Sequence, residues 1–382
     1  MRFVIVGTAY PLRGGIAQYV GLLYRALREK GHEAKIITFS RQYPKILFPG
    51  KFQEEQGSPG VAVESVQVID SINPLTWVTA GRLAAEFEPD AIIFTFWLPF
   101  FAPAYGLISR VAKKRLRAKG KKTKIIFIAH NVFPHEKRPF DKSLTNYAFK
   151  VVDHFIIQST AVERDLKIFK PDANYLRLEH PVFEAFAPGI DRSEARKKLG
   201  IGEGREVLLY FGFIRKYKGI DIAIRAIAEA AKKRPNLLLI VAGESYTGEE
   251  DYKLLAKELE VLDTNVKFFD QYISNDDVPA FFSAANAALL PYRHATQSGV
   301  VQIAYHYDLP VIATNVGGLP EIVIDKKSGL IAVDATPESV AKSIEEYFDQ
   351  DLEPRLRDGV RSEKPKYSWQ TFVEGIESLV RL

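Results

Sequence analysis

Short runs of apolar, often β-branched residues alternate with amphipathic stretches along most of this chain, and that alternation restricts the fold more than any other feature. Each run has the length of a strand, and most intervals between runs are long enough for a crossover helix, such as the pattern from about Ile16 to Lys30. Apolar strands joined by helices indicate a parallel sheet covered on both faces. In the first half the expected strands are Arg2–Gly7, Ala34–Phe39, Val61–Ile69, Asp90–Thr95, Lys124–Ile128 and Asp153–Gln158.

The alternation stops once, between His180 and Arg205, where two prolines and four glycines occur. We interpret this segment as a linker that carries one short helix at about Arg192–Leu199. The pattern then resumes, with strands expected at Val207–Phe213, Leu237–Ala242, Asn265–Phe269, Ala287–Leu290 and Val311–Thr314. The 382 residues therefore predict an α/β protein of two doubly wound domains, 1–182 and 183–366, with an amphipathic segment, 367–382, that packs back onto the first.

Composition narrows the range of functions. The absence of cysteine excludes disulfides, thiol nucleophiles, and zinc–thiolate and iron–sulfur sites. The net charge of +5 conceals an asymmetry, because residues 1–182 hold 27 Lys and Arg against 16 Asp and Glu, whereas the remainder holds 25 against 31. A basic first half predicts an anionic partner such as phosphate or a membrane surface. No apolar stretch is long enough to span a bilayer and the first residues do not resemble a signal peptide, so we expect a cytoplasmic protein.

Loops that follow strands are the candidate sites, because ligands of parallel sheets bind beyond the carboxyl ends of the strands. The first such loop ends in Gly14-Gly15 before a helix, where backbone N–H groups and the helix dipole favour an anion. An ordinary tight turn is the alternative. His130-Asn131 follows another strand, and this histidine could hydrogen-bond a substrate hydroxyl or donate to developing negative charge. The alternative is a buried histidine that bonds to the backbone.

The second half contains three further loops of this kind. Arg215 and Lys218 precede a helix, and two cations at a helix N-terminus predict a bound anion such as a diphosphate, although solvated side chains are the alternative. The segment Ser298-Gly299-Val300 opens another helix and offers backbone N–H groups to phosphate oxygens. The segment GGLPE, residues 317–321, forms a further glycine turn. Each loop is a weak signal alone, but the set in this order is specific.

Together these segments resemble those of the GT-B glycosyltransferases of the retaining family 4 type, over essentially the whole chain. The similar segments are GGIAQYV, HN after a strand, FGFIRKYKG, SGVVQIAYHYDLPVIATNVGGLPEIV and the terminal helix containing SW. The resemblance implies two Rossmann-like domains facing across a cleft. It also implies a hexosyltransferase that moves a hexose-type sugar from a nucleotide diphospho-sugar, such as a UDP- or GDP-sugar, to a hydroxyl of a glycan or lipid-linked acceptor. A sugar-nucleotide epimerase and a non-catalytic sugar-nucleotide-binding protein are the alternatives.

The resemblance also assigns residues. His130 would contact the transferred sugar, Lys218 would bind the diphosphate, and Arg215 would replace an arginine that the family has where Phe213 stands. The donor-binding residues would be Gly14, Gly15, Gln297, Ser298, Gly299, Val300 and Glu321. The acceptor-side residues would be Tyr10, Trp97 and Asn131.

One departure from the family concerns the ribose. The usual Glu-x7-Glu pair is absent, because its places fall on Ala295 and Ile303. The second glutamate of the family commonly holds the nucleotide ribose. Ribose recognition is therefore unassigned here, with Gln297, Gln302 and Glu321 as candidates.

The family also implies a mechanism without a cofactor or a metal ion. Retention would follow from front-face attack, with the leaving phosphate accepting the proton of the acceptor, so no nucleophilic carboxylate is needed. The sequence Asp349-Gln350-Asp351 spells an Asp-x-Asp motif, but it ends an acidic stretch after a helix and we interpret it as solvated.

The acceptor side has two further features. Eight of the twelve residues from Lys113 to Lys124 are Lys or Arg, which predicts contact with an anionic membrane surface, on the inner face of the membrane, or else only a solvated helix end. Phe96, Trp97, Phe100 and Phe101 follow a strand and are expected to form an acceptor wall. No nucleic-acid-binding motif is present, so we expect no nucleic-acid partner.

Overall fold

The chain forms two units in the computed structural model, which describes residues 1–44, 52–133, 139–245 and 252–382. The first unit comprises Met1–Glu55, Val61–Pro181 and Tyr367–Leu382, and the second comprises Gln56–Gly60 and Val182–Lys366. The short segment Gln56–Gly60 differs from the predicted boundaries, which place it in the first domain. It groups with the second unit because the N–H of Ser58 donates to Asp276 and the carbonyl oxygen of Ser58 accepts from Asn275.

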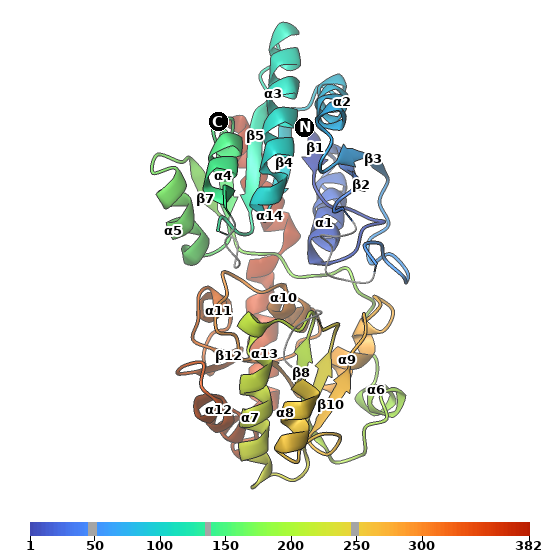
Figure 1. The fold of residues 1–382 in the computed structure, drawn as a ribbon, viewed down its shortest axis with the longest axis vertical. Helices are drawn as coiled ribbons and strands as arrows, with labels where there is room; N and C mark the ends of the chain where they lie inside the picture. The colour runs from blue at the N-terminus through green and yellow to red at the C-terminus, as the bar shows by residue number, and fades with distance from the viewer. Residues whose placement is uncertain (45–51, 134–138, 246–251) are drawn as a thin grey trace. The chain divides into compact units, whose positions relative to one another are not determined.

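A seven-stranded parallel sheet forms the centre of the first unit, in the order β3-β2-β1-β4-β5-β6-β7 (Figure 1). Its strands are β1 (Arg2–Val6), β2 (Glu33–Arg41), β3 (Ser65–Asp70), β4 (Ala91–Phe96), β5 (Lys124–Ala129), β6 (His154–Ile157) and β7 (Tyr175–Arg177). Its helices are α1 (Gly15–Glu29), α2 (Pro74–Glu86), the 3₁₀-helix η2 (Pro99–Phe101), α3 (Ala102–Ala118), α4 (Asp141–Phe149), α5 (Thr160–Phe169) and α14 (Trp369–Arg381). The predicted strands are confirmed, and only the three-residue edge strand β7 was not expected.

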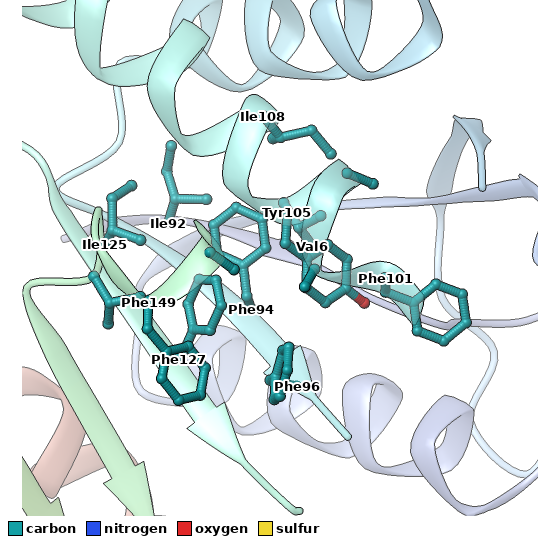
Figure 2. Close-up of a cluster of buried hydrophobic side chains, with 14 of the residues drawn as sticks. Val6, Ile92, Phe94, Phe96, Phe101, Tyr105, Ile108, Ile125, Phe127 and Phe149 are labelled. Carbon is teal, nitrogen blue, oxygen red and sulfur yellow. The ribbon is translucent and has the colours of Figure 1, made fainter. Parts of the chain in front are cut away.

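The sheet is buried on both faces, since successive side chains of its strands alternate between the faces and both sets are apolar. On one face Phe94 and Phe127 pack with ring centroids 4.9 Å apart, and Tyr105 of α3 lies 5.2 Å from Phe94 (Figure 2). The C-terminal helix α14 packs against α1. Its apolar side buries Trp369 and Phe372, as the amphipathic pattern predicts.

The second unit contains a six-stranded parallel sheet in the order β10-β9-β8-β11-β12-β13. Its strands are β8 (Glu206–Phe211), β9 (Leu237–Ala242), β10 (Val266–Phe269), β11 (Ala287–Leu290), β12 (Val311–Thr314) and β13 (Gly329–Ala332). Its helices are α6 (Arg192–Lys198), η3 (Lys216–Lys218), α7 (Ile220–Ala231), α8 (Tyr252–Glu258), α9 (Val278–Ala284), α10 (Gly299–His306), α11 (Leu319–Ile322), α12 (Pro337–Asp349) and α13 (Glu353–Glu363), followed by η4 (Lys364–Tyr367).

The two sheets confirm the predicted α/β class with two doubly wound domains. In each sheet the strand order reverses once, between β1 and β4 in the first and between β8 and β11 in the second. Loops diverge at such a point, and this is where ligands of doubly wound sheets bind. No helix in the described part of the chain combines the length and the hydropathy needed to cross a membrane.

Candidate active site

The loop after β1 carries the glycines that the sequence suggested. It leads directly into α1, whose N-cap is Gly14 and whose first residue is the exposed Gly15. No side chain caps this helix end, so its first N–H groups point to the loop without a side-chain acceptor. Tyr10 is half-buried in the same loop, and its carbonyl oxygen accepts a bond from Ser65 Oγ at 3.2 Å. The arrangement has the form of an anion site, and the ligand itself stays a prediction.

His130 follows β5 and lies in a buried polar cluster at the carboxyl edge of the first sheet. Tyr19 of α1 packs edge-on against it with ring centroids 4.7 Å apart, and the ring of His180 lies 6.1 Å away. Gln158, directly after β6, donates from Nε2 to Tyr19 Oη at 3.2 Å and also hydrogen-bonds the imidazole of His130. The His130 side chain is 4% exposed, so a substrate would contact it over a small part of its surface.

Burial keeps both histidines of this cluster uncharged. Desolvation lowers the pKa of His130 to about 3, with a further contribution from His180. Desolvation also lowers the pKa of His180 to about 4, although its bond to the backbone at Pro181 acts in the opposite direction. At neutral pH His130 is therefore a neutral imidazole, which can exchange hydrogen bonds with a hydroxyl but carries no positive charge. Asn131, the next residue, is half-buried.

The predicted acceptor wall is only partly available. Phe96 and Phe101 are 0% and 1% exposed and belong to the core, so they cannot line a binding surface. The expectation failed for Phe96 because it is the last residue of the buried strand β4, and for Phe101 because the chain turns into η2 after β4, which returns Phe101 to the core. Trp97 and Phe100 stay partly exposed, and Phe100 stacks on Tyr43 with ring centroids 5.8 Å apart and planes 17° apart.

Lys218 lies in the second unit, at the end of the turn η3 between β8 and α7. The turn closes through Gly219, which has a φ of +67°, in the left-handed region. A Cβ at Gly219 would lie well inside contact distance of the Pro291 carbonyl oxygen, so only glycine fits here. The Lys218 ammonium lies 5.9 Å from the ring centroid of Tyr292, which follows β11. Loops from the two strands at the reversal point therefore meet at this lysine.

The charge of Lys218 is held in an unfavourable environment. Burial, followed by the positive charge of Arg215, lowers the pKa of Lys218 to about 8. The side chain is half-buried, and no carboxylate of the described residues forms an ion pair with it. Lys218 is a cation beside a second cation and forms no ion pair with a carboxylate of the described residues, so its environment favours an anionic ligand.

The N-terminus of α10 lies beside the same tyrosine. Ser298 is the N-cap, but its side chain makes no capping bond and instead hydrogen-bonds Tyr292. Burial raises the pKa of the Tyr292 phenol, which stays protonated and available as a donor. Gly299 and Val300 are partly exposed in the first helical turn. Tyr292 thus connects Lys218 with the helix end that was predicted to bind phosphate.

The third loop, after β12, packs on the segment that follows Tyr292. Gly317 has a φ of +54°, and a Cβ there would overlap the carbonyl oxygen of Ala295. Ala295 and Ile303, which occupy the places of the two missing glutamates, are 8% and 9% exposed and offer no polar side chain. Gln297 and Glu321 are half-buried in these loops and stay candidates for donor binding.

Gln302 does not fit the ribose role that the sequence left open for it. Its side chain is 0% exposed on α10, so it presents no surface to a ligand. Neither atom of its amide has a hydrogen-bond partner among the described residues. Gln302 therefore directs its amide into the interior of the second unit.

The described residues contain no group of three or more His, Asp or Glu side chains that could hold a metal ion. Asp349, in the Asp-x-Asp sequence, ends α12 and forms an ion pair with Arg234, and its side chain is 63% exposed. This agrees with the interpretation of the motif as a solvated helix end. A metal-independent reaction stays a prediction.

The structure brings two predicted residues of the second unit, Lys218 and Ser298, to Tyr292, and a third, Arg215, lies beside Lys218. Sequence reasoning missed the side chains that hold the predicted residues in place. These are Tyr19, Gln158, His180, Tyr292 and Arg293. Four of them follow a strand within three residues of its end, which is the only signal that could have indicated them.

Two family descriptions match this chain, "Glycosyl transferase 4-like domain" over residues 14–175 and "Glycosyl transferases group 1" over residues 191–366. The chain is a GT-B glycosyltransferase of the family 4 type. It is therefore an enzyme of the transferase class, and the suspected resemblance is confirmed.

Relatives of this glycosyltransferase agree with the assignment. The D-inositol 3-phosphate glycosyltransferase of Acidothermus cellulolyticus is 28% identical, over 96% of this chain and 85% of the relative. The protein of the same name from Nocardioides sp. is 29% identical, over 56% of this chain and 50% of the relative. Among solved structures, Anabaena HepE in complex with UDP superposes with a TM-score of 0.73 over all of both chains at 18% identity, which supports the GT-B fold.

Proposed function

We propose that this glycosyltransferase moves a hexose-type sugar from a nucleotide diphospho-sugar to a hydroxyl of a glycan or lipid-linked acceptor, with retention of configuration at the anomeric carbon. HepE has the same fold and was solved with UDP and with UDP-glucose, which makes a UDP-sugar the first donor to test and a GDP-sugar the second. The name of the Acidothermus relative adds a phosphorylated polyol to the acceptors worth testing.

The observation that carries this proposal is the environment of Lys218. Its ammonium is half-buried beside Arg215, with a pKa lowered to about 8 and no carboxylate of the described residues paired with it. A diphosphate would supply the missing negative charge. The start of α10, beside Tyr292, would supply backbone N–H groups to the same phosphate oxygens.

In the proposed reaction the bond between the anomeric carbon and the phosphate oxygen breaks, and the acceptor oxygen bonds to that carbon on the same face. Negative charge builds up on the departing diphosphate, where Lys218, Arg215 and the N–H groups at the start of α10 stabilise it. One preorganised donor of this kind typically lowers the barrier by about 3 kcal/mol. The leaving phosphate oxygen takes the proton of the acceptor hydroxyl, so the step balances without a nucleophilic carboxylate.

The first unit contributes neutral and backbone groups to this proposal. His130 is uncharged, so its proposed role is a hydrogen bond to a hydroxyl of the transferred sugar. The N–H groups at Gly14 and Gly15 are proposed to bind a phosphate oxygen or the acceptor edge. The remaining proposed contacts are Gln297 and Glu321 for the donor, and Tyr10, Trp97 and Asn131 for the acceptor.

The test compares Lys218→Ala with Lys216→Ala, which removes an exposed cation from the same turn. Each protein is incubated with a panel of sugar nucleotides, with and without acceptors, and the released nucleoside diphosphate is measured by mass spectrometry. Loss of about 3 kcal/mol of barrier stabilisation predicts a fall in kcat of about 100-fold for Lys218→Ala. The control should stay within about threefold of the wild type. A loss under about threefold for Lys218→Ala removes this lysine from the mechanism. Interconversion of donor sugars without nucleotide release would indicate an epimerase instead.

The basic segment from Lys113 to Lys124 is proposed to bind an anionic membrane surface. The cations that are exposed and form no ion pair within the described residues are Lys114, Arg115, Arg117 and Lys122. Lys113 pairs with Asp153 at 2.7 Å, and Glu88 accepts bonds from two further lysines of the segment. Each free cation near an anionic surface contributes roughly 1 kcal/mol of binding.

This segment ends α3 and precedes β5, so it lies at the amino edge of the first sheet, opposite the edge that carries Gly14 and His130 (Figure 1). Membrane attachment and acceptor binding would therefore use different ends of the unit. The test is sedimentation with vesicles of phosphatidylserine and phosphatidylcholine against phosphatidylcholine alone, at rising salt. Equal binding to both vesicle types would contradict the proposal.

A further inference from the structure

Arg293 lies in the loop between β11 and α10 and faces the turn that carries Lys218. Its guanidinium donates two parallel bonds to the carboxylate of Asp221, from Nη1 to Oδ1 at 2.7 Å and from Nη2 to Oδ2 at 2.5 Å. Nη1 also donates to the carbonyl oxygen of Lys216 at 3.0 Å. The backbone N–H of Arg293 donates to the carbonyl oxygen of Tyr217 at 2.8 Å. One residue thus contacts both residues that precede Lys218 in η3.

The two residues before Arg293 contact the same turn. The carbonyl group of Pro291 packs against Gly219, and the ring of Tyr292 faces the ammonium of Lys218. Three consecutive residues of one loop, 291–293, therefore contact the turn from Lys216 to Gly219. The Arg293 and Asp221 side chains are 33% and 22% exposed, so the pair between them is partly shielded from water. Partly buried charge-assisted pairs of this kind hold geometry better than exposed surface pairs.

We propose that the Arg293–Asp221 pair positions Lys218 for the diphosphate of the donor, an inference that rests on the proposed function. Arg293 is a positioning residue, since it touches the backbone of the turn and the first helical turn of α7 rather than the ligand. The pair fixes the turn from both sides: Lys216 lies two residues before the lysine and Asp221 three residues after it. Lys218 itself has a flexible side chain, so its ammonium is held near Tyr292 only while the backbone of the turn is held.

The arginine is specific for this role. Its planar guanidinium forms two parallel bonds with a carboxylate and still reaches the Lys216 carbonyl, whereas a lysine ammonium at that position is a single point charge on a longer flexible stem. Arg293→Lys therefore keeps the charge but loses the geometry. Asp221→Asn keeps the shape of the partner but removes its charge. Both variants should release the turn without deleting any group that touches the ligand.

The experiment measures the binding of UDP, GDP, ADP and dTDP to the full-length protein by calorimetry, and follows the nucleotide that binds best. Lys218→Ala and Arg293→Lys are each expected to raise the Kd for this nucleotide by about tenfold. If Arg293 acts through the lysine, the two effects are not additive. Arg293→Lys should then change the affinity of the Lys218→Ala protein by less than about twofold.

The pH dependence separates positioning from a loss of folded protein. Among the described residues, Arg215 and the ring of Tyr292 face Lys218. Wild-type affinity should fall above about pH 8, where the unliganded lysine loses its proton. In Arg293→Lys the ammonium of Lys218 becomes more hydrated, which raises its pKa. The pH at which the affinity falls should therefore be higher than in the wild type. A smaller fraction of folded protein would lower the measured stoichiometry but leave the pH of the fall unchanged.

The matched control is Arg234→Ala, which removes a partly buried ion pair between an arginine and a glutamate at the amino end of β8. In this pair Glu206 accepts a hydrogen bond from Arg234 at 2.6 Å. This variant should bind the nucleotide like the wild type. The inference is overturned if Arg293→Lys binds like the wild type, or if it weakens binding equally with and without Lys218. A different pattern marks failure of the proposed function, namely no nucleotide bound by the wild type, or unchanged affinity in Lys218→Ala.

Discussion

Acidification should destabilise the first unit through its two buried histidines. The native pKa is about 3 for His130 and about 4 for His180, whereas a histidine in an unfolded chain has a pKa of about 6.5. Below pH 6.5 the unfolded chain therefore binds protons that the native chain does not bind. As the pH is lowered from 6.5, the free energy of unfolding therefore decreases. The decrease continues to about pH 4 for His180 and to about pH 3 for His130.

The magnitude follows from the distance to the unfolded pKa. At pH 5 the solution lies about 1.5 units below that value, so each histidine that stays neutral in the native state reduces the free energy of unfolding by about 2 kcal/mol. The two together reduce it by about 4 kcal/mol between pH 7 and pH 5. This is a large part of the stability of an ordinary domain.

All three tryptophans of the chain, Trp77, Trp97 and Trp369, belong to the first unit, so urea unfolding followed by tryptophan fluorescence reports on that unit alone. The comparison is between the wild type and His180→Gln at pH 7, 6 and 5. The variant should lose about 2 kcal/mol less than the wild type over this range. His294→Gln, an exposed histidine of the second unit, is the control. Equal pH dependence of the wild type and His180→Gln would refute the assignment of a buried neutral histidine.

Three further results are expected. Gly219→Ala should destabilise the second unit by about 2 kcal/mol, because φ is +67° and the new Cβ meets the carbonyl of Pro291; wild-type unfolding by circular dichroism would argue against this contact. At pH 8 the binding of UDP should take up about half a proton, because the diphosphate raises the pKa of Lys218 from about 8. Calorimetry in two buffers of different ionisation enthalpy measures this uptake, and uptake that persists in Lys218→Ala would contradict the prediction. Glu377→Gln should cost about 1 kcal/mol in the fluorescence assay, since this carboxylate is 14% exposed and contacts a histidine, a lysine and an arginine. Glu374→Gln, 51% exposed, should cost under about 0.5 kcal/mol, and equal losses would exclude a special role for Glu377.

The central strands of both sheets were predictable because a strand buried on two faces must be apolar at consecutive positions. This holds for β4 and β9, whose six residues are all buried. The edge strands β7 and β13 were not predicted because each is short. The strand β7 has three residues, of which Arg177 is exposed, and β13 begins with Gly329. Pairing with a neighbour defines these strands, and a short sequence carries no record of that pairing.

The candidate site was predictable only where a residue is anomalous in its own segment. Lys218 stood out because a cation at the start of a helix is locally unfavourable. Arg293 and Asp221 lie 72 residues apart and each is ordinary in its own loop, so only the fold reveals their bond. Phe101 shows the converse error, since an aromatic residue beyond a strand suggested a binding wall and the turn after β4 buries it.

The geometry of the second unit also explains why the missing glutamates need not abolish donor binding. The loop from Pro291 to Ala295 is held from two sides by close backbone contacts, on Gly219 at one side and on Gly317 at the other. Thr314 adds a bond from Oγ1 to the carbonyl oxygen of Tyr292 at 2.6 Å. These contacts are made by backbone and by small residues, so they do not depend on the side chain at position 295. The groups proposed to bind the diphosphate are accordingly placed by the three loops as a set, and a substitution that breaks one of these backbone contacts, such as one at Gly219 or Gly317, should be felt at the phosphate.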